Sequence, residues 1–312
     1  MITTTNDVKE FFESSESPIY IYGAGNPGYW VGKYLHLCGM NYEGYFDKGA
    51  RDVNCLMYGK TIYNPSEIPL VSAGENELRI IVAVKNVDEV LGQIHWYHNN
   101  RRIHCLIPMY EDYISKERIY DINKLLSFFR SKLLVGDVPT ILSNSCNAGF
   151  IYRALGVKRC SPTINNIIWP NDFLKLCKNP EKYLSKDIAF SHWTLHGGKK
   201  IPVGKIDDIE VYFVHDSSEK TAIERWNTYR KRVDLNNLIY LFSEDMGNVP
   251  INIIKEFCRL DTKHLFILQK NMYCGQEYKG CVYMNHVNFH IRDSAWENWF
   301  DLVGWINGDI EI

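Results

Sequence analysis

A glycine-rich turn directly after a short apolar run is the feature that most restricts how this chain can fold. Residues 18–22 have the pattern of a buried strand, Gly23-Ala24-Gly25-Asn26-Pro27-Gly28 follows, and an apolar helical stretch runs from about Tyr29 to Cys38. A strand, a turn with the spacing G-x-G-x-x-G and a helix, in this order, are typical of a dinucleotide-binding βαβ unit. Asp47 ends the next apolar run and has the position of an acidic residue that binds a ribose hydroxyl.

The motif predicts a cofactor-binding site formed by Gly23, Gly25, Gly28 and Asp47. In such a site the first glycine makes the tight turn, the second lets the backbone approach a pyrophosphate, and the third lets helix and strand pack closely. Similar glycines also serve chain geometry alone. The cofactor is therefore left open, with a nucleotide sugar and NAD as the two groups that fit the motif.

Strand and helix patterns alternate along the rest of the chain. Strand-like runs occur at 42–46, 79–84 and 103–107, and again at 140–142, 208–214, 238–242 and 264–268, with helical segments between most of them. This alternation predicts an α/β fold with two Rossmann-like, three-layer α/β domains and mainly parallel sheets. We expect the first domain at residues 1–115, a connecting helix at 116–136 and a second α/β domain at 137–312.

Composition restricts the partners. The formal net charge is −2 and the pI is 6.6, so no nucleic-acid partner is expected. No apolar stretch is long enough for a membrane span, and the first residues lack the features of a secretory signal. The nine cysteines include no C-x-x-C pair, which indicates reduced thiols in a cytoplasmic protein. No metal site is predicted, because the spaced histidines His192/His196 and His286/His290 have no nearby Glu or Cys partner.

Polar clusters follow three predicted strands of the second half, at residues 143–147, 215–218 and 243–245. If these strands are parallel neighbours, the clusters meet at one edge of a sheet, where α/β proteins bind ligands. We expect His215 to act as a general base, with Cys146 and Asp216 as further catalytic residues. The expected substrate-binding residues are Ser143, Asn144, Ser145, Asn165, Arg225, Ser243 and Glu244, with Arg225 neutralising a phosphate.

The same residues also allow a purely structural interpretation. Asn144, Asp216 and Ser217 are of the types that cap helices, and Asp216 with Glu219 has the spacing of a capping box. Cys146 could be a small buried apolar residue. Both interpretations stay open at this point. The chain has no D-x-D triad, which disfavours a metal-dependent glycosyltransferase.

Two stretches resemble known bacterial proteins. Residues 19–25 together with 43–47 resemble the small Rossmann-like module of sugar-modifying and polysaccharide-assembly proteins. Residues 142–152, Leu-Ser-Asn-Ser-Cys-Asn-Ala-Gly-Phe-Ile-Tyr, followed by Ser-Pro-Thr-Ile-Asn at 161–165, resemble a family of unknown function commonly labelled exopolysaccharide or capsular polysaccharide biosynthesis proteins. This resemblance covers about residues 137–275. The family typically has two glycines after the cysteine, where this chain has Ala148 and Gly149.

The resemblance implies a step in the assembly of a bacterial cell-surface polysaccharide. Together with the polar clusters it suggests a metal-independent transferase that uses a nucleotide-activated sugar, so that a sugar nucleotide or a glycan is the expected partner. One alternative is a non-catalytic nucleotide- or sugar-binding regulator or scaffold. An NAD-dependent sugar oxidoreductase is less favoured, because Tyr229 is followed four residues later by Val233 and not by lysine. No particular oligomeric state is predicted.

Overall fold

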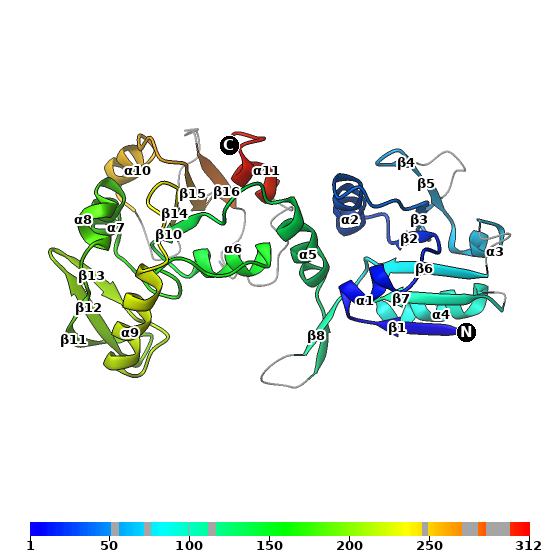
Figure 1. Cartoon of the computed structure of the whole chain (residues 1–312), viewed down its shortest axis with the longest axis horizontal. Helices are drawn as coiled ribbons and strands as arrows, with labels where there is room; N and C mark the ends of the chain where they lie inside the picture. The colour runs from blue at the N-terminus through cyan, green and yellow to red at the C-terminus, as the bar shows by residue number, and fades with distance from the viewer. Residues whose placement is uncertain are drawn as a thin grey trace. The chain divides into compact units, whose positions relative to one another are not determined.

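The computed structural model describes residues 1–50, 56–71, 76–98, 100–111, 117–244, 249–269, 280–284 and 300–312. The chain is mixed α/β and divides into two compact units (Figure 1). The first unit comprises residues 1–133 and the second begins at Leu134. Among the described residues, no helix has the length and apolar character that crossing a membrane requires.

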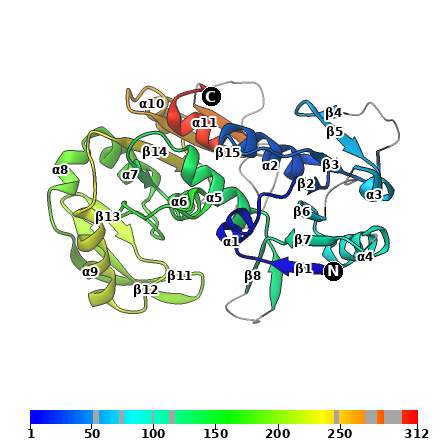
Figure 2. The same cartoon turned by 45° about the vertical axis from the view of Figure 1, so that its right-hand side comes forward.

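The first unit is built on a seven-stranded sheet in which every pairing is parallel except that of β4 with β5. Figure 2 shows β6, β7 and β1 of this sheet side by side. The order across the sheet is β1 (Ile2–Thr5), β7 (Arg102–Leu106), β6 (Glu77–Val82), β2 (Ile19–Tyr22), β3 (Gly44–Phe46), β5 (Lys60–Tyr63) and β4 (Leu56–Met57). The mainly parallel sheet expected for the first half is thus present.

Helices cover both faces of this sheet because β2 is apolar on both sides. Ile19 and Ile21 pack with α1 (Val8–Glu13), α2 (Asn26–Leu37) and α5 (Asn123–Leu133). Tyr20 and Tyr22 face the opposite side, with α4 (Val87–Tyr97) and the short α3 (Ile68–Val71). The alternation follows the two-residue period of a strand.

Helix α5 lies inside the stretch expected to connect the domains. Its apolar stripe of Leu125, Leu126 and Phe129 is fully buried in the first unit. The helix begins later than the sequence pattern indicated, because residues 118–120 form strand β9 (Arg118–Tyr120), which pairs with β8 (Met109–Glu111).

The second unit contains two sheets of different kinds. A four-stranded parallel sheet has the order β10 (Thr140–Ser143), β14 (Leu238–Ser243), β15 (His264–Gln269) and β16 (Cys281–Met284). A separate antiparallel sheet has the order β11 (Ala189–His196), β12 (Lys199–Ile206) and β13 (Ile209–Tyr212). Gly197 and Gly198, both with positive φ, form the two-residue turn between β11 and β12. The prediction of mainly parallel sheets holds for the four-stranded sheet of this half. It fails for the segment at 208–214, which pairs with an antiparallel hairpin in a separate sheet.

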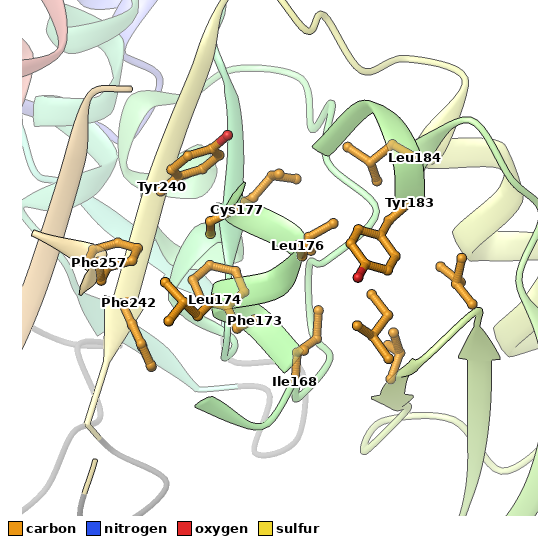
Figure 3. Close-up of a cluster of buried hydrophobic side chains, with 14 of the residues drawn as sticks. Ile168, Phe173, Leu174, Leu176, Cys177, Tyr183, Leu184, Tyr240, Phe242 and Phe257 are labelled. Atoms are coloured by element: carbon orange, nitrogen blue, oxygen red, sulfur yellow. The ribbon is translucent and has the colours of Figure 1, made fainter. Parts of the chain in front are cut away.

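Helix α7 (Pro170–Lys178) packs between these two sheets (Figure 3). Its buried Phe173 contacts Phe242 of β14 edge-to-face, with the ring centroids 5.3 Å apart. On its other side Leu176 lies near Tyr183 of α8 (Pro180–Leu184) and the antiparallel sheet (Figure 3). The other helices among the described residues of this unit are α6 (Asn147–Leu155), α9 (Glu219–Arg230), α10 (Ile251–Phe257) and α11 (Leu302–Asn307). This shared core fixes the ends of β10 and β13 relative to each other.

Candidate functional site

A thiol and an imidazole that are 69 residues apart in the sequence meet in the second unit. Cys146 Sγ lies 3.3 Å from His215 Nε2, within hydrogen-bonding distance for sulfur. Cys146 is partly exposed and His215 is exposed. Two residues predicted to be catalytic are therefore in contact where a small molecule can reach them.

Cys146 stands at the start of a helix, held there by a buried polar turn. It directly precedes α6, and the residues around it at 143, 144, 145 and 147 are buried. The Asn144 side-chain amide donates to the Ser243 carbonyl oxygen and accepts from the Ser243 N–H, both at 2.8 Å. Ser143 Oγ accepts from the Ser145 N–H, and Ser145 Oγ accepts from the side chain of Asn147. The polar groups that we expected to bind substrate thus form hydrogen bonds with one another and with the end of β14.

The first turn of α6 also packs against the loop at residues 161–166. A side chain at Gly149 would place its Cβ 3.0 Å from Asn165 Oδ1 and 3.2 Å from Ile164 Cγ2. Asn165 has a left-handed φ of 61°, and Ala148 beside Gly149 is fully buried. Side chains of the loop at 161–166 therefore pack directly on Gly149, while Ala148 is buried in the core.

His215 reaches this turn from the antiparallel sheet. β13 ends at Tyr212, which pairs with Ile167, and the next residue, Ile168, donates its N–H to the Asn144 carbonyl. Only two of the three strands expected to be parallel neighbours are neighbours, namely β10 and β14. The cluster at 215–218 is brought to this edge by residues 167 and 168, which link β13 to the end of β10.

Asp216 and Arg225, two further predicted site residues, form an ion pair. Arg225 Nη1 donates to Asp216 Oδ1 at 2.9 Å, and Nη2 lies 2.7 Å from Oδ2. The Asp216 side chain is 7% exposed. The Asp216 carboxylate therefore neutralises the positive charge of Arg225, which we expected to neutralise a phosphate. The predicted capping box is wrong, since α9 is capped by Ser218, whose Oγ accepts from the Thr221 N–H.

The third polar cluster lies at the end of β14. Ser243 is fully buried and bonded to Asn144, and the buried Glu244 donates its backbone N–H to the Ile267 carbonyl. Asp245 lies outside the described residues. Two of the three clusters, at the ends of β10 and β14, are therefore adjacent through parallel pairing, as the strand-end argument requires.

In the first unit, chain geometry accounts for two of the three motif glycines. Gly23 has a φ of 111°, and a Cβ at Gly28 would lie 1.9 Å from the Gly23 carbonyl oxygen. A Cβ at Gly25 would contact only Pro27, at 3.8 Å. Asp47 accepts from the backbone N–H groups of Ala24 and Gly49, at 2.7 and 2.8 Å. The carboxylate expected to hold a ribose is thus already bonded to the turn.

A cavity of about 140 Å³ adjoins this turn. Its lining includes Tyr22, Gly23, Asp47, Lys48 and Glu89, and Lys48 pairs with Glu89 at 2.8 Å. Pockets for drug-sized ligands usually measure about 300–1,000 Å³. The size and the two carboxylates suit a small hydroxyl-bearing group better than a pyrophosphate.

In the described part of the chain, no group of three or more His, Cys, Asp or Glu residues is arranged to hold a metal. His192 and His196 both lie in β11, and His286 and His290 fall outside the described residues.

The fold and the Cys146–His215 pair define an α/β protein with a thiol–imidazole site, and comparison with known proteins adds a family. Residues 117–310 match the model described as "Domain of unknown function (DUF1919)", and the chain belongs to this family. An "Uncharacterized protein" of Haemophilus influenzae is 29% identical over 203 residues, which are 62% of this chain and 94% of that protein. The family match at 117–310 contains every site residue of the second unit, and it extends beyond the stretch at 137–275 that carried the resemblance.

Proposed function

We propose that the chain is a cytoplasmic group transferase in bacterial cell-surface polysaccharide assembly, with Cys146 and His215 at its reaction centre. The observation that carries this proposal is the 3.3 Å contact between Sγ and Nε2. The polysaccharide context rests on the resemblance of residues 142–152 and 161–165. The mechanism needs a reduced thiol, which a cytoplasmic location supplies.

A thiol and an imidazole within hydrogen-bonding distance support a mechanism of covalent transfer. His215 Nε2 takes the thiol proton, and the thiolate attacks the electrophilic carbon of the donor. A bond from Sγ to that carbon forms while the bond to the leaving group breaks, and the imidazolium returns its proton to the leaving group. An acceptor hydroxyl, deprotonated by His215, then attacks the same carbon, the bond from that carbon to Sγ breaks, and the imidazolium returns the proton to the departing thiolate. The start of α6 favours negative charge at Cys146, because its backbone N–H groups point toward that end.

The proposed donor is a nucleotide-activated sugar. Arg225 is paired with Asp216, so we assign donor contact to Cys146, His215 and the start of α6. A sulfur nucleophile beside a histidine serves acyl transfer equally well, and an acyl thioester is therefore included as a second donor in the test.

The test is the capture of the covalent intermediate. The full chain is incubated with UDP-, GDP- and CDP-sugars and with acetyl-coenzyme A, and its mass is measured before and after digestion. We expect a mass increase equal to the transferred group, located on the peptide that contains Cys146. Cys146→Ser should abolish the increase and His215→Ala should slow it. Cys160→Ser is the matched control, because Cys160 is also partly exposed and burial raises the pKa of its thiol. An equal mass increase in the Cys146→Ser variant would contradict this mechanism.

A second candidate function is a nucleotide- or sugar-binding regulator. It is favoured by the cavity beside the glycine turn, at the carboxyl ends of β2 and β3 in a parallel sheet, which would hold the sugar or ribose of the ligand and leave any pyrophosphate outside. A thermal-shift panel with NAD and the same sugar nucleotides tests it. A ligand at ~100 times its dissociation constant adds about 2.7 kcal/mol to the free energy of unfolding, which raises Tm by several degrees. A shift lost in Gly25→Val, without any mass increase at Cys146, would favour the regulator.

A further inference from the structure

We infer that Arg225 is a positioning residue. It holds the turn at 213–216, which carries His215, against the loop at 161–166, which packs on α6 beside Cys146. This inference rests on the proposed function, because it assigns Arg225 the task of setting the contact between Sγ and Nε2. It replaces the phosphate-binding role expected for Arg225 from the sequence.

The guanidinium contacts both ends of the turn that presents His215. On one side, Nη1 and Nη2 face the two carboxylate oxygens of Asp216, at 2.9 and 2.7 Å. On the other side, Cζ lies 6.0 Å from the centre of the Phe213 ring. The turn itself is closed by a hydrogen bond from the Asp216 N–H to the Phe213 carbonyl. His215 therefore sits between two residues that share one partner.

The same guanidinium reaches the loop at 161–166. Arg225 Nη2 donates to Asn166 Oδ1 at 2.7 Å, and Asn166 is fully buried. The Asn166 side chain also donates to the Pro162 carbonyl, which fixes the amide in the loop. Arg225 is thus anchored to the loop at 161–166 through an amide that the backbone of this loop holds in place.

This loop is in turn bonded to the elements that carry Cys146. Thr163 Oγ1 accepts from the Ser143 N–H at the end of β10. Asn165 and Ile164 lie against Gly149 in the first turn of α6. A continuous set of contacts therefore runs from His215 through Arg225 and the loop to Cys146.

Arginine suits this position because its planar group donates in several fixed directions at once, here to a carboxylate and to an amide oxygen. The Arg225 side chain is 24% exposed and its partner Asp216 only 7%, so salt screens the pair less than a surface pair.

The experiment measures the rate at which iodoacetamide alkylates Cys146 across the pH range, in the full chain, by peptide mass spectrometry. A thiol paired with an imidazole keeps a reactive thiolate at low pH, whereas an isolated thiol ionises near a pKa of about 8.5. His215→Ala should move the profile toward that of an isolated thiol. Arg225→Gln and Asp216→Asn should move it in the same direction. Alkylation near pH 6.5 should slow by about tenfold, which is the fall in thiolate fraction when the pKa of the thiol rises by one unit.

Arg230→Gln is the matched control. Arg230 lies in α9 like Arg225, and it also forms an ion pair with an aspartate, Asp187. It should leave the Cys146 profile unchanged. Asp216→Asn keeps the shape of the turn and decides the result if Arg225→Gln fails to fold. If His215→Ala changes nothing, the proposed function fails. If His215→Ala shifts the profile but Arg225→Gln and Asp216→Asn do not, only the positioning role is overturned.

Discussion

The Asn144 side chain and the Ser243 backbone exchange two hydrogen bonds of 2.8 Å across the ends of β10 and β14. Both residues are fully buried, so a polar group left unpaired there carries a desolvation cost. The side-chain amide thus extends the pairing of two parallel strands by one step beyond the last residue of β10 and fixes the turn that leads to Cys146.

Asn144→Ala should destabilise the second unit by about 2–4 kcal/mol, since each buried polar group left unpaired costs roughly 1–3 kcal/mol. The free energy of unfolding from urea titration measures this effect. Asn171→Ala is the control, because Asn171 is an exposed asparagine of the same unit. Equal stability of the two variants would contradict the role given to the Asn144 amide.

The glycine turn of the first unit should respond to substitution in two ways. Gly28→Ala places a methyl group 1.9 Å from the Gly23 carbonyl oxygen, and overpacking of this kind costs about 1–3 kcal/mol or more. Gly25→Ala meets only Pro27, at 3.8 Å, and should cost below about 1 kcal/mol. Thermal unfolding of both variants provides the comparison. A Gly25→Ala variant as unstable as Gly28→Ala would mean that packing, and not ligand approach, explains Gly25.

The carboxylate of Asp208 should stabilise the fold in a defined pH range. The hydroxyl of Tyr183 and the ammonium group of Lys175 hold the pKa of Asp208 at about 2, against about 3.9 in an unfolded chain. A lowered pKa in the folded state means that the stabilisation is complete above the unfolded value and is lost as the pH falls toward 2. The difference in stability between wild type and Asp208→Asn should therefore shrink below about pH 4.

This difference is measured by urea unfolding at a series of pH values. Asp261→Asn, at an exposed aspartate of the same unit, provides the reference for a general charge effect. A difference that stays constant from neutral pH down to pH 2 would show that Asp208 is not held by its two partners.

Cys105 and Cys146 should differ strongly in native labelling. Burial raises the pKa of the Cys105 thiol to about 12, so at pH 8 roughly one molecule in ten thousand carries its thiolate. Cys146 is partly exposed and contacts His215. We expect iodoacetamide at pH 8 to label Cys146 and to leave Cys105 unmodified until denaturant is added. Labelling of Cys105 at the same rate as Cys146 in the native protein would contradict this assignment.

Much of the first unit could be predicted from the sequence because its signals are local. The run at 87–97 forms a helix with the predicted bounds, and β2 and β3 fall within the predicted strands. The antiparallel hairpin of β11 and β12 was missed. β11 is largely exposed along its length, whereas residues 201–204 of β12 are buried in succession. Neither strand therefore shows the alternation by which a half-buried strand is recognised.

The candidate site was only partly visible in the sequence. Strand-end reasoning placed Cys146 and His215 at one sheet edge on the condition that their strands are parallel neighbours. β13 lies in another sheet, and the contact depends on residues 167 and 168, which carry no motif. The pairing of Arg225 with Asp216 was also hidden, because it requires the turn before α9 to fold back on the helix. Tertiary contacts of this kind leave no periodic pattern in the sequence.

The two members of the thiol–imidazole pair follow strands of different sheets, so the order of folding determines when they meet. A nascent chain that has formed only β10 and α6 carries an ordinary cysteine at position 146. Its partner becomes available only after 69 further residues have been synthesised and the hairpin has docked, and such distant contacts form late because closing long loops costs entropy. Under the proposed function, Cys146 therefore gains its histidine partner only when the second unit has folded, and the unfinished chain does not yet carry the thiol–imidazole pair.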